Sequence, residues 1–266
     1  MPSWGRNIIL IIAMLMVSCS SPPEIFTPTQ DTSISILEAV KDPLGVIESS
    51  NLTTVEKRSR TGAVKVSRPF ENGHGSGTYM TMYGQFVVVT AAHVVEGHTV
   101  MHIQERDGSF AIGRLIYTSP TADLAVLHVP PLKTRIAVPY RPKKNTTNLL
   151  GAPISYTGFP GHHDLITIRG HVASLEHNMI VSNMFGWFGS SGSGVFDRQG
   201  RFLGVVSGID VGRWNVPIPL DSIVWVAPAW NFDEELLEIR VKTAPPLSSF
   251  NSFPGARAPR RGGVRD

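Results

Sequence analysis

Apolar and polar residues alternate in short runs from about residue 61 onward. A period of two over four to eight residues is typical of half-buried β-strands. The first set of runs covers 63–67, 77–82, 85–90, 99–104, 110–117 and 124–129. The second set covers 154–158, 165–175, 179–182, 194–197, 202–207 and 223–227. Two sets of six short strands indicate two small barrels.

The break between the two sets consists of Pro130, Pro131 and the polar stretch 141–148. The 25 glycines and 20 prolines among 266 residues favour many strands joined by turns over a helical bundle. The sequence therefore predicts an all-β fold of two six-stranded antiparallel β-barrels. Barrel one spans about 61–133 and barrel two about 150–229.

A short C-terminal helix is expected over 230–240, after the last strand. Asn231 is the expected N-cap, and Asp233, Glu234 and Glu235 fall in the first turn, where the helix dipole favours acidic side chains. The remaining 241–266 is rich in Pro, Gly, Ser and Arg and is expected to be disordered.

The N-terminus has the pattern of a secretory signal. Arg6 precedes an apolar run over 8–17 that is too short for a comfortable transmembrane helix. Cys19, the single cysteine of the chain, follows this run directly. The segment 16–19 resembles the bacterial lipobox, which implies a signal peptide over 1–18 and lipidation of Cys19. An ordinary signal peptide or an uncleaved anchor, with Cys19 incidental, is the alternative.

The following segment, 19–60, is rich in Ser, Thr and Pro and ends in a charged cluster. We interpret it as a tether between membrane and folded domain. The expected location is therefore extracytoplasmic and membrane-anchored, on the periplasmic side or the cell surface. Four arginines against one aspartate in the last eleven residues account for the whole net charge of +3, so no nucleic-acid partner is expected.

Three short segments carry the candidate chemistry. They contain His93 after an apolar strand, Asp123 before another, and Ser191 between glycines in the run 189–194. The intervals are 30 and 68 residues. A histidine, an aspartate and a displayed serine together specify acyl transfer, in which the histidine activates the serine hydroxyl and the aspartate orients the histidine.

The stretch 61–240 resembles the trypsin-like serine peptidases, nearest the bacterial HtrA-type and glutamyl-endopeptidase-type branch without disulfides. The segments 87–95, 121–127 and 189–194 carry this resemblance. It implies a serine endopeptidase with protein or peptide substrates and no cofactor or metal. A PDZ domain is not expected after residue 240.

The resemblance also implies the remaining site residues. The backbone N–H groups of Gly189 and Ser191 would form the oxyanion hole. The substrate pocket would involve the residues Phe185, Phe188, Val206, Ser207 and Ile209. Its apolar composition predicts a shallow pocket for small or medium aliphatic side chains, with Ser207 and Ile209 bonding the substrate backbone.

Two alternative functions keep the same fold. One is a non-catalytic binding module that retains the barrels. The other is a viral or phage protease that processes one polyprotein and keeps an uncleaved anchor.

Overall fold

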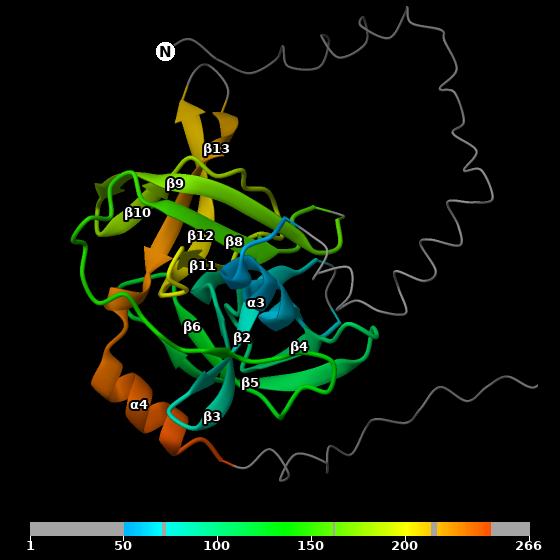
Figure 1. Ribbon diagram of the computed structural model, residues 1–266. Helices are drawn as coiled ribbons and strands as arrows, with labels where there is room; N and C mark the ends of the chain where they lie inside the picture. Colours follow the sequence, from blue (N-terminus) through cyan, green and yellow to red (C-terminus); the bar gives the residue numbers. More distant parts are fainter. Residues whose placement is uncertain (1–50, 71–72, 162, 214–216, 246–266) are drawn as a thin grey trace, which may run out of the picture. The chain divides into compact units, whose positions relative to one another are not determined.

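The computed structural model describes residues 51–70, 73–161, 163–213 and 217–245 (Figure 1). The expected signal peptide over 1–18, Cys19 and the tail over 246–266 lie outside the described residues. Within the described ranges, no helix combines the length and the apolar character needed to cross a bilayer.

Barrel one closes as the sequence predicts. Its strands are β1 (Ala63–Ser67), β2 (Gly75–Met82), β3 (Gln85–Thr90), β4 (Val100–Gln104), β5 (Phe110–Thr118) and β6 (Ala125–His128). They follow the order β1-β4-β5-β6-β3-β2, and β1 pairs back onto β2 to close the sheet. A two-residue strand, β7 (Val138–Pro139), adds to β2 in parallel.

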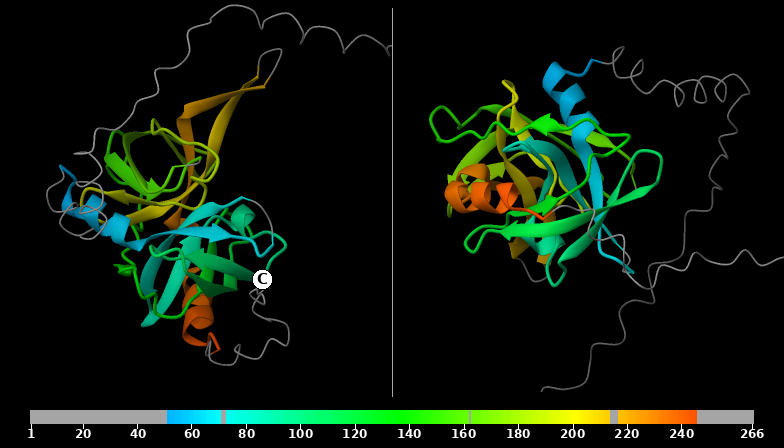
Figure 2. Two further views of the ribbon diagram at one scale, coloured as in Figure 1. Left: turned by 90° about the vertical axis from the view of Figure 1, so that its right-hand side faces the viewer. Right: turned by 90° about the horizontal axis from the view of Figure 1, so that it is seen from below.

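Barrel two is a second closed sheet of six antiparallel strands. They are β8 (Pro153–Gly158), β9 (Ile166–Glu176), β10 (Met179–Ser182), β11 (Gly194–Asp197), β12 (Phe202–Arg213) and β13 (Pro217–Pro228), in the order β10-β13-β12-β11-β8-β9. The two six-stranded antiparallel barrels confirm the predicted fold class (Figures 1 and 2).

The inward-facing residues of each barrel form its core. In barrel one, Val87, Val88 and Val89 have no exposed surface, and they pack in one cluster with Phe196 and Phe202 of barrel two. The two barrels therefore share apolar packing. The C-terminal helix α4 (Glu234–Lys242) joins this same cluster through Leu237 and Val241, so it covers barrel one although it follows barrel two in the chain.

The C-terminal helix begins later than expected. Residues 229–231 form the single 3-10 turn η2 (Ala229–Asn231), and α4 is capped by Asp233, whose side chain accepts from the Leu236 amide. Asn231 instead donates to the Asn178 carbonyl oxygen. The helix continues to Lys242, two residues into the segment expected to be disordered.

The expected tether over 19–60 is wrong in its last part, because Thr54–Gly62 forms the helix α3. Thr53 accepts from the Glu56 amide while the Glu56 carboxylate accepts from the Thr53 amide, which is a complete capping box. The Ser59 hydroxyl bonds that of Thr157 on β8, and a Cβ on Gly62 would lie 2.9 Å from the Tyr79 carbonyl oxygen on β2. Helix α3 thus contacts both barrels.

Strands β12 and β13 also extend further than the alternation predicts. The expected strands end at 207 and begin at 223, whereas the observed strands pair as far as Arg213 and Pro217. Gly208, Gly212 and Pro219 interrupt the hydrophobic pattern in this extension. Hydrogen bonding between β12 and β13, rather than burial of an apolar face, therefore holds this extension together.

Candidate active site

His93 and Asp123 come from two neighbouring turns of barrel one. His93 lies in the 3-10 turn η1 (Ala92–Val94) directly after β3, and Asp123 lies in the turn before β6, which pairs with β3. The Asp123 carboxylate accepts from the His93 ring Nδ1 at 2.8 Å and from the His93 backbone N–H at 2.9 Å. Two bonds to one residue fix both the place and the rotation of the imidazole.

The Asp123 carboxylate has a third donor that the sequence did not indicate. The Ser207 hydroxyl donates to Asp123 Oδ2 at 2.6 Å, so the side chain of this residue faces the acid–base pair. Burial works to raise the pKa of Asp123. The hydrogen bonds from the His93 ring, the Ser207 hydroxyl and the His93 amide outweigh burial and hold this pKa below its usual value. Asp123 is therefore ionised at neutral pH.

Ser191 lies on a loop that only glycines allow. Gly189 and Gly192 have φ of 91° and 88°, in the left-handed region. A Cβ on Gly189 would lie 2.5 Å from the Phe159 carbonyl oxygen, and one on Gly192 would lie 2.1 Å from the Ser76 carbonyl oxygen. The backbone conformation and the lack of space both require glycine at these two positions, which explains the glycines of the run 189–194.

Two backbone donors on this loop are open. Within the described residues, no acceptor is bonded to the N–H groups of Gly189 or Ser191. The Ser191 hydroxyl is 3.5 Å from the Ser207 carbonyl oxygen, at the limit of hydrogen-bond length. This places Ser191 against the same residue whose side chain bonds Asp123.

Ser76 on β2 attaches the loop to barrel one. Its hydroxyl donates to the Gly189 carbonyl oxygen at 2.7 Å and accepts from the Phe159 N–H at 3.0 Å. Its backbone N–H donates to the Ser191 carbonyl oxygen at 2.7 Å. Sequence reasoning missed this residue because a serine between Gly75 and Gly77 carries no chemical signal without its distant partners.

A hollow of about 350 Å³ opens directly at these residues. His93, Gly189 and Ser191 line it together with His74 and Arg68. It therefore brings together the candidate base, the candidate nucleophile and one of the two open amides. Phe188, which is 77% exposed, forms part of its wall.

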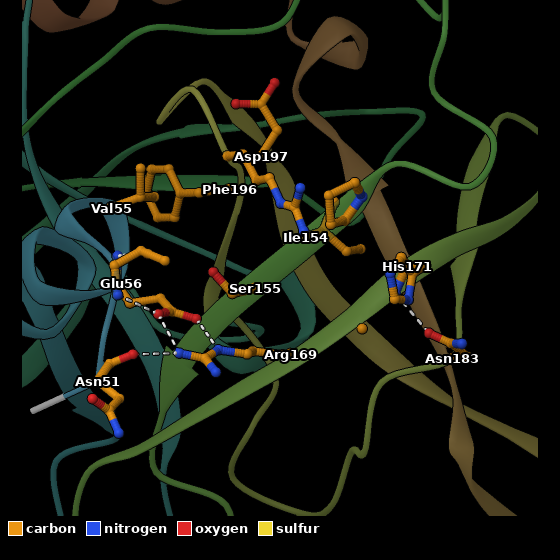
Figure 3. A pocket seen from close by; sticks show the side chains of 14 residues that line it. Asn51, Val55, Glu56, Ile154, Ser155, Arg169, His171, Asn183, Phe196 and Asp197 are labelled. Carbon is orange, nitrogen blue, oxygen red and sulfur yellow. Dashed lines mark hydrogen bonds and ion pairs between the residues drawn. The ribbon is translucent and has the colours of Figure 1, made fainter.

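A larger hollow of about 550 Å³ lies elsewhere, between α3 and barrel two (Figure 3). Its wall contains the Glu56–Arg169 ion pair and the bond from the His171 N–H to the Asn183 side chain. It contains none of the candidate catalytic residues. A choice of site by hollow volume alone would therefore miss the candidate catalytic residues.

The expected pocket residues fall into different environments. Phe185 is 43% exposed and Ile209 is half-buried. Val206 has no exposed surface and packs in the core cluster of barrel two. The roles of these residues in substrate binding stay predictions. In the described part of the chain, no group of three or more His, Cys, Asp or Glu side chains is arranged to hold a metal ion.

Comparisons with known proteins agree with this geometry. Residues 75–205 match the model of the trypsin-like peptidase domain. A serine endoprotease from Yersinia pestis is similar at 18% identity, over 73% of this chain and 69% of that chain, with a TM-score of 0.57. An inactive form of a protease from M. tuberculosis is similar at 20% identity, over 73% of this chain and 93% of that chain, with a TM-score of 0.54.

A third structure, an HtrA-type protease with a tripeptide, shares 22% identity over 70% of this chain and 60% of that chain, with a TM-score of 0.55. At these identities the structural likenesses establish the fold. The family match covers the segments that hold His93, Asp123 and Ser191.

Proposed function

We propose that the chain is a serine endopeptidase that cleaves peptide bonds through His93, Asp123 and Ser191, because residues 75–205 match the model of the trypsin-like peptidase domain. The observation that carries this proposal is the pair of bonds from His93 to Asp123. An ionised carboxylate only accepts hydrogen bonds, so Nδ1 carries the proton. The lone pair on Nε2 is then free to act as a base.

The reaction follows from these positions. His93 Nε2 takes the Ser191 proton as the oxygen attacks the substrate carbonyl, and Asp123 stabilises the imidazolium that forms. The open N–H groups of Gly189 and Ser191 donate to the oxygen on which negative charge develops. His93 then protonates the leaving amine, and a water molecule activated by the same nitrogen hydrolyses the acyl-enzyme.

The contact from Ser191 to Ser207 is compatible with this role. At 3.5 Å the bond is weak, and a hydroxyl group rotates freely about its Cβ–Oγ bond. Catalytic hydrogen bonds are commonly long before substrate binds and shorten in the complex. Substrate binding would therefore complete the contact between Ser191 and His93.

Labelling by a fluorophosphonate probe tests the triad. The full-length wild type should label on Ser191. Ser191→Ala should not label, and His93→Ala should label at least about a hundredfold more slowly because the general base is lost. Ser109→Ala, which removes an exposed hydroxyl bonded to Asp107, is the matched control. No labelling of a wild type shown to be folded would contradict the proposal.

The preferred side chain at the acylated residue is small or medium and aliphatic. A Cβ on Gly186 would lie 2.7 Å from Val224 Cγ2 and 2.8 Å from Ile209 Cγ2, so two branched side chains fill the space behind this glycine. Cleavage-site profiling on an unfolded protein should therefore show Ala, Val or similar residues before the cut. A preference for Lys, Arg or Glu there would contradict this part of the proposal.

We also propose that the enzyme is held at a membrane on the extracytoplasmic side through lipidated Cys19. The support is the charged start, the apolar run and the position of the single cysteine. Metabolic labelling with an alkyne fatty acid in a bacterial host should mark the wild type and leave Cys19→Ala unmarked. Label on both proteins, or on neither, would contradict lipidation at this residue.

A further inference from the structure

Four basic side chains from separate elements gather beside helix α3. Arg60 lies on α3 itself, Lys65 on β1, Arg106 directly after β4, and Arg135 in the connection between β6 and β7. We call these four residues the basic cluster. Arg106 and Arg135 are distant from Arg60 in the sequence, so the fold and not a run of charged residues brings them together.

Hydrogen bonds between these elements hold the cluster together. The Ile136 N–H donates to the Thr61 carbonyl oxygen at 3.1 Å, which joins the end of α3 to the connection before β7. The Arg106 guanidinium donates to the Arg60 carbonyl oxygen at 3.4 Å, and the Arg106 backbone N–H donates to the Thr134 hydroxyl at 2.8 Å. The three arginines of the cluster are therefore carried by segments that are bonded to one another.

One aromatic ring joins the lysine of the cluster to Arg135. The Lys65 ammonium lies 5.2 Å from the centre of the Phe159 ring, and the Arg135 guanidinium carbon lies 5.9 Å from the same centre. The Phe159 side chain belongs to barrel two and is buried. The face of the ring attracts both cations, but the ring carries no net charge that could balance them.

Arg135 carries a positive charge that its surroundings compensate poorly. The side chain is half-buried, its Nε atom is buried, and within the described residues no acceptor is bonded to Nε. Burial and the nearby charge of Arg106 lower the pKa of Arg135 to about 10, and the opposing effect of Glu105 is smaller. Burial also lowers the pKa values of Arg60 and Arg106. Because buried charges are normally paired and hydrogen-bonded, this arrangement indicates a place for an anion.

The neighbouring carboxylates do not balance the cluster. Glu105 accepts from the Thr134 N–H at 2.6 Å and from the Thr134 hydroxyl at 2.9 Å, both through Oε2. Asp164 lies 3.9 Å from the ammonium group of the cluster, and its side chain is fully exposed. Arg60 donates to the Thr167 hydroxyl, which is neutral. Within the described residues, neither carboxylate forms an ion pair with an arginine of the cluster.

We propose that the basic cluster binds a phosphate group, carried either by a soluble phosphate compound or by a lipid headgroup. A tetrahedral phosphate presents several acceptor oxygens, so it can bond more than one guanidinium fork and an ammonium group at the same time. A carboxylate has two oxygens in one plane and would serve a single fork. This inference goes beyond the proposed function and does not depend on it.

Titration calorimetry on the full-length wild type, with two water-soluble probes, tests the proposal. Inorganic phosphate represents a soluble phosphate compound, and glycerophosphoglycerol represents the headgroup of phosphatidylglycerol without its acyl chains. Sodium chloride at the same ionic strength is the blank, because screening alone acts on any charged surface. Saturable binding of inorganic phosphate alone supports a soluble ligand, whereas binding of glycerophosphoglycerol that is equal or tighter supports a lipid headgroup.

Three variants locate the bound anion. Arg135→Gln should weaken phosphate binding about tenfold or more, which is the scale of one lost hydrogen bond to a charged group. Arg106→Gln should weaken it similarly, and it keeps the test decisive if the first variant does not fold. Arg240→Gln removes the same charge from the exposed last turn of α4 and should bind phosphate as the wild type does.

Two further measurements support or overturn the assignment. The NMR signal of the Arg135 Nε–H should shift along a saturating curve as phosphate is added to the wild type. Phosphate should also raise the urea midpoint of the wild type and of Arg240→Gln, and leave that of Arg135→Gln unchanged. Equal affinities in the wild type, Arg135→Gln and Arg106→Gln would place the anion elsewhere and overturn the proposal. A response that only matches the sodium chloride blank would show screening alone and would overturn it as well.

Discussion

Barrel one and barrel two present their candidate catalytic residues in different ways. Barrel one holds His93 and Asp123 in adjacent turns, joined by two hydrogen bonds that both belong to that barrel. Barrel two presents Gly189 and Ser191 on a loop that bends at glycines and that is tied to Ser76 of barrel one. The acid–base pair is thus built within one barrel, whereas the nucleophile loop depends on both.

This difference separates two kinds of damage. A substitution of His93 or Asp123 should abolish catalysis and leave the packing of the two barrels intact. A substitution in the loop should lower the catalytic rate by shifting the backbone of Gly189 and Ser191. A substitution at the interface between the barrels should mainly lower the free energy of unfolding.

The largest effect is expected from Asp123→Asn. The amide can donate to Nδ1, which would favour the tautomer with its proton on Nε2, and kcat should fall by about 10⁴. Steady-state kinetics on the preferred peptide measures this, with the urea midpoint checking the fold. Asp107→Asn, at an exposed turn where Asp107 bonds Ser109, is the matched control and should keep wild-type kcat. A loss below about tenfold would argue against an acid–base role for Asp123.

Gly189→Ala should have the next largest effect. The added methyl group would lie 2.5 Å from the Phe159 carbonyl oxygen in a conformation with positive φ, so the Gly189 N–H must shift. Losing one oxyanion donor should lower kcat by about 10² to 10³. Gly84→Ala has a similar φ of 82° but open space around it, and should cost about 1 kcal/mol of stability with kcat unchanged. Equal kcat values for the two variants would argue against the oxyanion hole.

The sequence pattern predicted those segments whose structure is determined by their own residues. Val87, Val88 and Val89 form a β-strand because a short run of branched apolar residues favours a strand that is buried on both faces, and the glycine run at 189–194 is explained by its own backbone angles. The twelve strands and the three candidate catalytic segments were therefore predictable.

The parts that were missed depend on distant partners. Glu56 lies in a charged cluster that reads as solvated, yet Arg169, 113 residues away, neutralises it beneath the surface. Ser76 matters only because Gly189 and Phe159 approach it from barrel two. The capping box of α3 was visible in the sequence, but a polar nine-residue helix forms only with tertiary contacts.

Glu56→Gln should lower stability by about 2 kcal/mol at pH 7. The bond from Arg169, at 2.8 Å, outweighs burial and lowers the pKa of Glu56 to about 2. A folded-state pKa below the unfolded value gives stability that is complete above about pH 4.5 and is lost as the pH falls toward 2. Urea titrations should therefore show the wild type and the variant converging over this range.

Glu238→Gln is the control for that experiment. Glu238 pairs with Lys242 on the exposed face of α4, where an ion pair contributes a few tenths of a kcal/mol. A Glu56→Gln deficit that stays constant from pH 7 to 2 would show that the lost stability comes from packing and not from the charge. The attachment of α3 to barrel two would then need another explanation.

Ser207→Ala should have the smallest effect, since Ser207 joins barrel two to a pair that barrel one already orients. Losing its 2.6 Å bond to Asp123 should lower kcat/KM about three- to tenfold, the scale of one hydrogen bond. The donor lowers the pKa of Asp123, so its removal raises that pKa toward the ordinary value. Protonation of Asp123 then begins at a higher pH, which a pH titration of the Asp123 carboxyl carbon by NMR measures directly. Ser109→Ala breaks a bond of the same length to Asp107 and should leave this titration unchanged. A titration of Asp123 that does not move in Ser207→Ala would show that the two bonds from His93 alone keep Asp123 ionised, and that barrel two supplies the nucleophile without tuning the base.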